Sequence, residues 1–380
     1  MPTSSTTPDT GPDLTGRLAR VADRGLRWHG RTEQPDPDSI QRIVVLKPCC
    51  LGDMLMATPA VRALNQHAPN AGIAIVTDQW TRPAVETNPR IDRIISHPSP
   101  GGIRGAVQLA WQLRPFSFDV GISLDRSPMT ALSLALARIP VRAGIDSHGR
   151  GIGLTHRVSP ETETHETDLY LAVLKTLGID SRSSVPEYHI PDETIASVNQ
   201  MLPDRDEKRL VVIHPGGAVN PGVAMLEKRW PATNFGELAA LLIREANAKV
   251  VLIGSESDQG AVETVRDFAR APVIDLCGQL SLPEVAALCQ RASLFVGNDS
   301  GVTHLASAVG TPVVAIFGPT NPGRYRPLGR KVVVCAQEES WNAPDPGDLR
   351  SARRNALPDI AEVPLPKVLN GCLELLGGSA

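Results

Sequence analysis

The stretch Gly297-Asn-Asp-Ser-Gly-Val-Thr-His-Leu-Ala-Ser-Ala-Val-Gly310, followed by Thr311-Pro-Val-Val-Ala-Ile-Phe317, decides the fold of this chain. It reads as a short strand, a tight turn, a helix with apolar residues at helical spacing, and a second buried strand. In such a βαβ unit, free backbone N–H groups and the positive end of the helix dipole meet where the helix begins. The turn Asp299-Ser300-Gly301 is therefore expected to receive a phosphate, although Asp299 taken alone fits an ordinary N-cap equally well.

His304 supports a ligand site at this turn. It lies off the apolar stripe of the predicted helix, on the same side as Ser300, Thr303 and Ser307. A polar stripe in the first turns of a buried α/β helix indicates a face that contacts a ligand. A lone histidine in such a place is more often structural than catalytic, and that interpretation stays open.

The overall composition narrows the possible functions. The chain has 380 residues, enough for two or three domains, and its formal net charge of −3 gives no electrostatic footprint for nucleic acid. The six cysteines show no metal-ligand spacing, and the adjacent Cys49-Cys50 pair cannot be a normal structural disulfide. We therefore expect a reducing cytoplasm and no bound metal. Without an apolar run of bilayer length or a signal peptide, we expect a soluble or at most peripheral protein.

Alternating strand and helix patterns predict an α/β protein with two doubly wound, Rossmann-like halves. In the first half the expected strands are 43–46, 74–77, 92–96, 118–124 and 141–145, with helices over 104–113, 130–137 and 165–177. In the second half the expected strands are 210–213, 250–253, 273–276, 293–296 and 313–317, with helices over 233–245, 261–269, 282–289 and 301–309.

The predicted organisation has five parts: an extension over 1–39, a first domain over 40–180, a polar linker over 181–208, a second domain over 209–357, and a last segment over 358–380. We expect the final helix, about 365–376, to pack back onto the first domain. The extension carries arginines among apolar residues, which is compatible with contact with an anionic membrane. A poorly ordered leader with one solvated helix is the preferred interpretation.

In the first half, the loop Lys47-Pro-Cys-Cys-Leu-Gly-Asp53 leaves the carboxyl end of the first strand. Ligands bind beyond that end of a parallel sheet, so Asp53 is predicted to lie in the site. The loop holds one glycine where a dinucleotide fingerprint needs three, which counts against an NAD-dependent oxidoreductase. Thr58 and Pro59 look like the cap and first turn of the next helix.

Three further residues of the first half, Arg126, Arg142 and His148, fall at or after predicted strand ends. They are candidates for holding an anionic acceptor, and solvated surface positions are an equally good interpretation for each of them.

The second half offers a phosphate site. Paired glycines in His214-Pro-Gly216-Gly217 follow its first strand and allow backbone N–H groups to approach a phosphate, unless they form a plain turn. Lys228 and Arg229 precede the next helix, where two cations would stabilise a leaving diphosphate. The carboxylates of 254–258 are suited to bind ribose hydroxyls, and a surface turn is the alternative interpretation. The backbone near Leu280 follows the third strand, where it could contact the edge of the nucleotide base.

Taken together, these stretches resemble glycosyltransferase family 9, which includes the ADP-heptose:lipopolysaccharide heptosyltransferases. The resemblance covers about residues 41–330 and rests on Leu51-Gly-Asp53, Thr58-Pro-Ala60, His214-Pro-Gly216, Lys228-Arg-Trp-Pro231, Gly297-Asn-Asp-Ser-Gly301 with His304, and 310–320. It implies the GT-B fold, two Rossmann-like domains that face a central cleft. The acceptor would bind to the first domain and the nucleotide sugar to the second. It also implies inverting, metal-independent transfer without a cofactor beyond the donor.

Under this resemblance, Asp53 matches the general base that takes the proton of the acceptor hydroxyl. Lys228 matches the cation that stabilises the leaving diphosphate, with Arg229 beside it. The other implied donor contacts are Asp299, Ser300 and Gly301 at the helix start, His304 in support of that loop, and either Glu256 or Asp258 for the ribose.

The acceptor is left open between a lipopolysaccharide core sugar, another envelope glycan and a small natural product. The chain departs from the family at Cys49-Cys50, where small hydroxyl residues are common, and at residues 218–227, which have no assigned counterpart. A GT-B nucleotide-sugar epimerase or hydrolase is an alternative. So is a non-catalytic nucleotide-sugar-binding protein, although the joint presence of Asp53, Lys228 and Asp299 argues against it.

Overall fold

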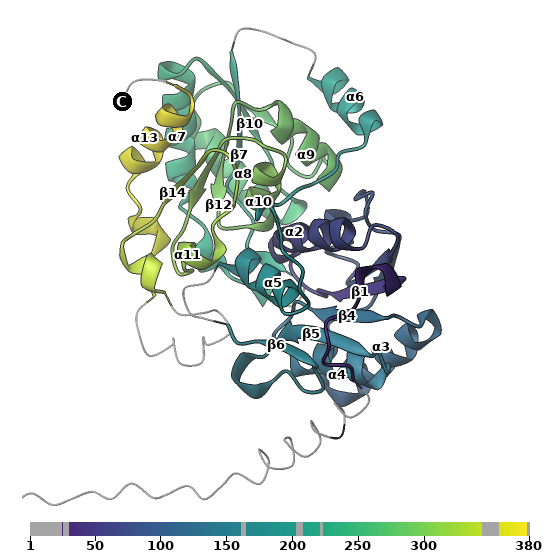
Figure 1. The fold of residues 1–380 in the computed structure, drawn as a ribbon. Helices are drawn as coiled ribbons and strands as arrows, with labels where there is room; N and C mark the ends of the chain where they lie inside the picture. Colours follow the sequence, from purple (N-terminus) through teal and green to yellow (C-terminus); the bar gives the residue numbers. More distant parts are fainter. Residues whose placement is uncertain are drawn as a thin grey trace, which may run out of the picture.

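The computed structural model describes residues 25, 30–160, 165–202, 208–220, 223–343 and 357–377 (Figure 1). Most of the predicted extension, with its basic helix, lies outside these residues. The described chain forms two six-stranded parallel sheets with helices on both faces, and we call the parts around them the leading half and the trailing half. This confirms the predicted α/β fold of two doubly wound halves.

The leading sheet has the strand order β3-β2-β1-β4-β5-β6. Its strands are β1 (Arg42–Leu46), β2 (Gly72–Thr77), β3 (Arg93–Ser96), β4 (Val120–Ser123), β5 (Val141–Ile145) and β6 (His156–Val158). Helices α2 (Leu51–His67) and α5 (Glu166–Lys175) cover one face, and α3 (Gly102–Leu113) and α4 (Pro128–Leu136) cover the other. Ile43 of β1 packs toward the first pair of helices and Val44 toward the second. Because both faces are covered, the strand is apolar from Ile43 to Leu46.

The trailing sheet has the order β11-β10-β7-β12-β13-β14. Its strands are β7 (Arg209–His214), β10 (Ala248–Leu252), β11 (Ile274–Asp275), β12 (Leu294–Asn298), β13 (Val313–Ile316) and β14 (Val332–Cys335). Its helices are α7 (Ala232–Glu245), α8 (Gln259–Ala269), α9 (Leu282–Arg291), α10 (Gly301–Ala308), α11 (Pro322–Tyr325) and α13 (Leu365–Leu375). A short hairpin of β8 (Val219–Asn220) and β9 (Val223–Ala224) follows β7.

Every predicted strand is present, but each sheet has one more edge strand than expected. In the leading half this is β6, which is His156-Arg-Val158 and has no apolar alternation to reveal it. In the trailing half it is β14, a short apolar run that periodicity alone cannot assign to a strand. The sequence-based count of five strands a sheet is therefore corrected to six.

The predicted start of the first helix at Thr58 and Pro59 is wrong, because α2 begins at Leu51 and Pro59 lies inside it. A proline in a helix interior has no N–H for the carbonyl four residues earlier, here that of Leu55. The hydroxyl of Thr58 donates to this carbonyl at 2.7 Å. The missing bond is thus replaced locally, which a pattern of caps and breakers does not reveal.

Two expectations about the connections also need correction. The predicted linker contains a helix, α6 (Asp192–Met201), which packs on α9 of the trailing half. The last helix, α13, packs against α7 and β14, so it completes the trailing half and does not return to the leading half. Its apolar face is buried there through Val368 and Cys372.

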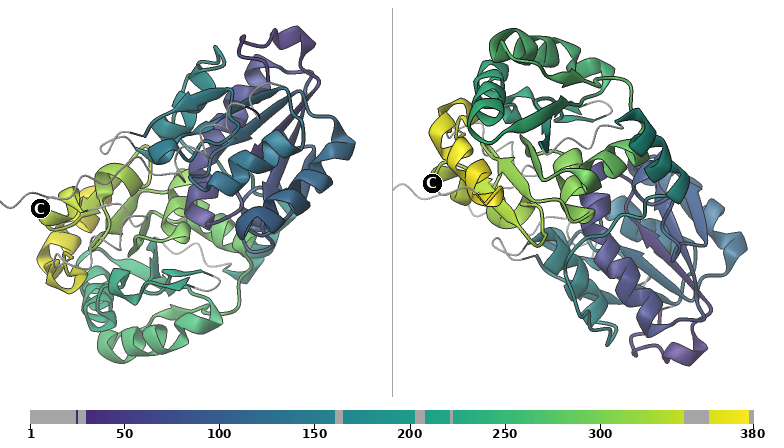
Figure 2. Two further views of the ribbon diagram at one scale, coloured as in Figure 1. Left: turned by 90° about the horizontal axis from the view of Figure 1, so that it is seen from below. Right: turned by 90° about the horizontal axis from the view of Figure 1, so that it is seen from above.

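The two halves meet along α2 and α10, and Figure 2 shows them as two lobes joined on one side. The contact is close because glycines stand where the helices begin. A Cβ on Gly301 would lie 2.7 Å from the Cβ of Leu51, and one on Gly52 would lie 3.0 Å from the His304 ring. The first turns of two helices, one from each half, therefore lie beside each other.

Candidate active site

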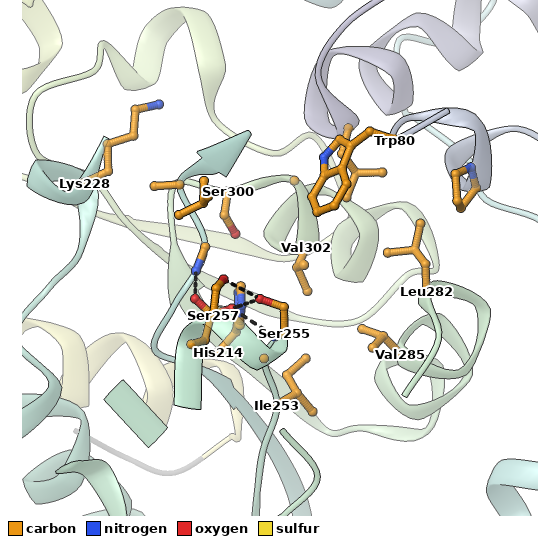
Figure 3. A pocket seen from close by; sticks show the side chains of 18 of the residues that line it. Trp80, His214, Lys228, Ile253, Ser255, Ser257, Leu282, Val285, Ser300 and Val302 are labelled. Atoms are coloured by element: carbon orange, nitrogen blue, oxygen red, sulfur yellow. Dashed lines mark hydrogen bonds and ion pairs between the residues drawn. The ribbon is translucent and has the colours of Figure 1, made fainter. Parts of the chain in front are cut away.

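A cavity of about 460 Å³ lies between the halves (Figure 3). The trailing half lines it with residues at or after the ends of β7, β10 and β12, which include His214 and Ser300. The leading half contributes Leu51, Trp80 and Pro83. The cavity therefore lies at the carboxyl ends of parallel strands, where doubly wound sheets bind ligands.

The loop Pro215-Gly216-Gly217 is held tightly beside this cavity. A Cβ on Gly216 would overlap the side chain of Asp258, and Gly217 has a φ of +86° that favours glycine. Asn298, fully buried at the end of β12, donates from Nδ2 to the carbonyls of the first two loop residues at 3.0 and 3.1 Å. Sequence reasoning missed this role of Asn298 although the residue stands beside Asp299.

The carboxylate of Asp258 forms hydrogen bonds to the same loop and to its neighbours. Its Oδ1 accepts from the Gly217 N–H at 3.2 Å and from the Arg229 guanidinium at 2.8 Å, and its Oδ2 accepts from the Ser255 N–H at 2.9 Å. Burial opposes ionisation, but His214 and Ser255 outweigh it and hold the pKa of Asp258 well below its usual range. Arg229 also donates to the Gly217 carbonyl and does not line the cavity. Arg229 thus holds the loop through both contacts, and its predicted contact with the diphosphate stays a prediction.

The two acids considered for the ribose differ sharply. Asp258 lines the cavity, but its oxygens are occupied as described above. Glu256 is exposed and does not itself line the cavity, although its neighbours Ser255 and Ser257 do. Asp258 therefore faces the cavity with oxygens that already accept hydrogen bonds, and Ser255 and Ser257 are the other polar residues that this loop presents there. Which acid contacts the ribose stays a prediction.

One end of the cavity is apolar, lined by Ile253, Leu280, Leu282, Val285 and Val302. Leu280 was predicted to lie near a base edge, and this end suits a flat heterocycle. Trp80 of the leading half lies over it (Figure 3), with 52% of its surface exposed. The adjoining turn η2 (Arg82–Ala84) contacts α9. Sequence reasoning missed Trp80, which belongs to no motif and whose only signal is its position just after β2.

The trailing wall of the cavity carries an ion pair of Lys228 with Asp299, and Thr320 contacts the same carboxylate. The Nζ of Lys228 lies 2.7 Å from Oδ2 of Asp299, and the Thr320 hydroxyl donates to the same oxygen at 2.6 Å. Burial disfavours the ionised Asp299, but the Lys228 charge outweighs this and lowers the pKa of the carboxyl. Lys228 and Asp299 line the cavity with Ser300 and Gly301, which begin α10. A cation and free helix N–H groups are thus brought to one wall.

His304 lies behind this wall, between the two halves. It is 5% exposed, packs against Gly52 and does not line the cavity. Burial lowers the pKa of His304 to about 4, although the carboxylates of Asp299 and Asp53 act in the opposite direction. His304 is thus a buried ring of α10 that packs against the first turn of α2.

The burial of His304 predicts a pH dependence of stability. Between about pH 6.5 and about pH 4 the unfolded chain binds a proton at this ring and the folded chain does not, so acidification lowers the free energy of unfolding, by on the order of 3 kcal/mol in full. Burial also lowers the pKa of His165, so this residue adds to the loss of stability as the pH falls. Urea unfolding at a series of pH values should therefore show a weaker loss in His304→Gln than in the wild type. Equal losses in both proteins would contradict this assignment.

On the leading side, Asp53 stands in the first turn of α2, where the helix dipole favours an anion. Its Oδ2 lies 3.1 Å from Nζ of Lys47, and Oδ1 takes no hydrogen bond from the described residues. Burial works against the charge on Lys47, but Asp53, Asp125 and Glu166 outweigh it and raise its pKa. Lys47 was missed as a site residue although it lies at the end of β1 in the quoted loop. The Lys47 ammonium therefore orients the carboxylate that is predicted to act as base.

The three predicted acceptor residues do not form one group. Arg142 is fully buried, and its guanidinium donates to the carbonyls of Gly153 and Ile139, so the expected acceptor contact is wrong for this residue. Arg126 forms an ion pair with Glu166, which also pairs with Arg324 of the trailing half. The side chain of His148 lies outside the described part of the chain.

Several other findings bear on the expectations from composition. Cys49 and Cys50 form a disulfide between neighbours just before α2, and the other four cysteines are free and buried. Among the described residues, no group of three or more His, Cys, Asp or Glu is arranged to hold a metal ion. No helix in the described ranges is long and apolar enough to cross a membrane.

Comparison with known proteins gives a consistent picture. The sequence model of glycosyltransferase family 9 (heptosyltransferase) matches residues 106–353. The chain is 27% identical over 349 residues to lipopolysaccharide heptosyltransferase 2 of Escherichia coli K12, covering 87% of this chain and 98% of that protein. Among solved structures, a family 9 glycosyltransferase from Veillonella parvula superposes with a TM-score of 0.75 at 25% identity, covering 91% and 100% of the two chains. The E. coli ADP-heptose lps heptosyltransferase II gives 0.69 at 25% identity, covering 88% and 98%.

Proposed function

Because the chain belongs to glycosyltransferase family 9 and has the GT-B fold, we propose that it moves a heptose-type sugar from ADP to a hydroxyl acceptor. The names of its relatives support this choice, since they include lipopolysaccharide heptosyltransferases and one that specifies ADP-heptose. We take a lipopolysaccharide core sugar as the first candidate acceptor. We further propose that the transfer inverts the anomeric centre and needs no metal.

The observation that carries the proposal is the meeting of the first turns of α2 and α10 at one cavity. Asp53 comes from the leading half, and Lys228 and Asp299 come from the trailing half. In the proposed reaction, Asp53 Oδ1 takes the proton of the acceptor hydroxyl as its oxygen attacks the anomeric carbon. The bond from that carbon to the diphosphate breaks on the opposite side, which inverts the centre.

The leaving diphosphate is proposed to bind where α10 begins. Negative charge builds on it as the glycosidic bond breaks, and Lys228 Nζ together with the N–H groups of Ser300 and Gly301 stabilises that charge. Asp299 holds the lysine in place through its 2.7 Å ion pair. A lysine and a helix N-terminus thereby fill the role that a divalent cation plays in other transferases.

The reaction itself is tested by product analysis. We expect the protein, incubated with ADP-heptose and a lipopolysaccharide core acceptor, to form ADP and heptosylated acceptor in equal amounts, at a rate that EDTA does not change. Nuclear magnetic resonance of the product should show the inverted anomeric configuration. Release of a free or epimerised sugar without acceptor would instead favour the hydrolase or epimerase alternative, and loss of activity in EDTA would end the metal-independent mechanism.

The apolar end of the cavity is proposed to bind the adenine base, with Trp80 stacked on it. We expect ADP to raise the melting temperature more than UDP or GDP. Stacking on an aromatic ring is worth on the order of 1–3 kcal/mol, so Trp80→Ala should weaken ADP binding about tenfold, measured by calorimetry. The matched control is Trp111→Ala, which removes an indole exposed on another face, and it should bind ADP as the wild type does. If the wild type and both variants bound ADP with equal affinity, Trp80 would not be part of the ADP site.

A further inference from the structure

The outer face of α3 exposes three large apolar side chains. Ile103, Val107 and Trp111 follow one another at four-residue spacing and therefore form one stripe along the helix, which we call the α3 stripe. Their surfaces are 68%, 37% and 65% exposed. Single exposed apolar residues are common, but an aligned set on one helix marks an interaction surface.

The α3 stripe points away from the reaction site. The opposite side of α3 packs on the leading sheet and α4 through Leu109 and Leu113. These two helices cover the face of the sheet opposite to α2, and α2 is the helix that meets the trailing half (Figure 1). A partner on the stripe would therefore leave the donor cavity and the contact between the halves untouched.

The segment that carries the stripe has charged side chains of one sign only. The segment 93–118 contains Arg93, Arg104 and Arg114 and no aspartate or glutamate. Two of these cations lie against aromatic rings, Arg114 at 5.0 Å from the Trp111 centroid and Arg93 at 4.9 Å from that of Phe116. Asp119, the next acid in the chain, accepts hydrogen bonds from backbone N–H groups of β1 and its approach. The surface thus combines an apolar stripe, which includes an exposed tryptophan, with arginines from a segment that has no acidic residue.

We propose that the α3 stripe rests on the surface of an anionic phospholipid bilayer. Helices that lie in a membrane interface have this composition, with apolar side chains among the acyl chains and arginines on lipid phosphates. Tryptophan prefers the level of the headgroups. A second copy of this chain is less suited, because a twofold contact would set the arginines of both copies against each other. The binding does not depend on the proposed reaction.

Sedimentation with lipid vesicles tests the proposal on the full-length protein. We expect the protein to pellet with vesicles of equal parts phosphatidylcholine and phosphatidylglycerol, to stay in solution with pure phosphatidylcholine, and to be released by high salt. The double variant Ile103→Ser/Trp111→Ser should lower the partition coefficient at least about tenfold, because each side chain loses apolar burial. Arg104→Glu should also lower it. The control Phe268→Ser, which removes a large apolar side chain exposed on α8, should bind as the wild type does.

Three outcomes would overturn the proposal. The first is that the double variant binds vesicles as well as the wild type does, and the second is that the wild type binds neutral and anionic vesicles equally. The third is that light scattering shows the wild type as a dimer and the double variant as a monomer. The last would assign the stripe to a second copy. ADP binding by each variant, measured in parallel, should stay at the wild-type value. A failure of the lipid proposal is thereby distinguished from a failure of the proposed reaction.

Discussion

Asp53→Asn should reduce the rate of sugar transfer by at least about a hundredfold, the scale expected for losing a general base. An amide cannot take the acceptor proton, yet it has the shape of the carboxylate and still accepts a hydrogen bond from Lys47 Nζ, which lies 3.1 Å from Oδ2 in the native protein. Asp53 does not line the donor cavity, so the affinity for ADP should stay nearly unchanged. Steady-state transfer assays and calorimetry with ADP measure the two quantities separately.

The matched control for this variant is Asp267→Asn, which makes the same chemical change at an exposed carboxylate of α8. It should leave both transfer and ADP binding at the wild-type level. A loss of ADP affinity in Asp53→Asn as large as its loss of rate would show that the residue binds the donor. The assignment of Asp53 as base would then fail, while transfer by another base would remain possible.

Lys228→Met should slow the chemical step by about a hundredfold or more and weaken donor binding much less. The methionine fills a similar volume but cannot stabilise the charge that grows on the departing diphosphate. Single-turnover transfer at saturating donor isolates this step from product release. A wild-type single-turnover rate in Lys228→Met would contradict the proposed role.

Lys228→Met has a second, separable effect on stability. It leaves the buried carboxylate of Asp299 with the hydroxyl of Thr320 but without its cation, and breaking such a pair costs about 3–5 kcal/mol. Adding Asp299→Asn should restore most of this stability, because a neutral amide needs no counter-charge. It should not restore the rate. If the double variant regained both, the lysine would act through folding alone.

Much of this site could be predicted from the sequence because its residues follow strands. Asp53, His214 and Asp299 come at or after the ends of β1, β7 and β12, and parallel strands bring those ends to one edge. Lys47 and Asn298 stand in the same loops, yet their roles depend on the neighbours that the fold supplies. Lys47 needs the turn into α2 to reach Asp53, and Asn298 needs the glycine loop more than 80 residues earlier.

The wrong prediction for Arg142 involves a long side chain whose direction the sequence does not determine. Arg142 stands at a position where an anion contact is reasonable, but its guanidinium is buried and donates to carbonyls of its own half. Asp258 was correctly placed near the cavity, and its carboxylate is used up by N–H donors of two loops. Trp80 went unnoticed because a contact from the opposite half leaves no local pattern.

The position of α13 also bears on how the protein is made. Val368 and Cys372 of this helix are fully buried in the same core as Val211 of β7. Since synthesis runs from the N-terminus, the leading sheet has all of its strands by Val158, whereas the trailing core lacks the side covered by α13 until that helix has left the ribosome. We therefore expect the leading half to fold during translation, and the unfinished trailing half to be the part of the nascent chain that chaperones protect.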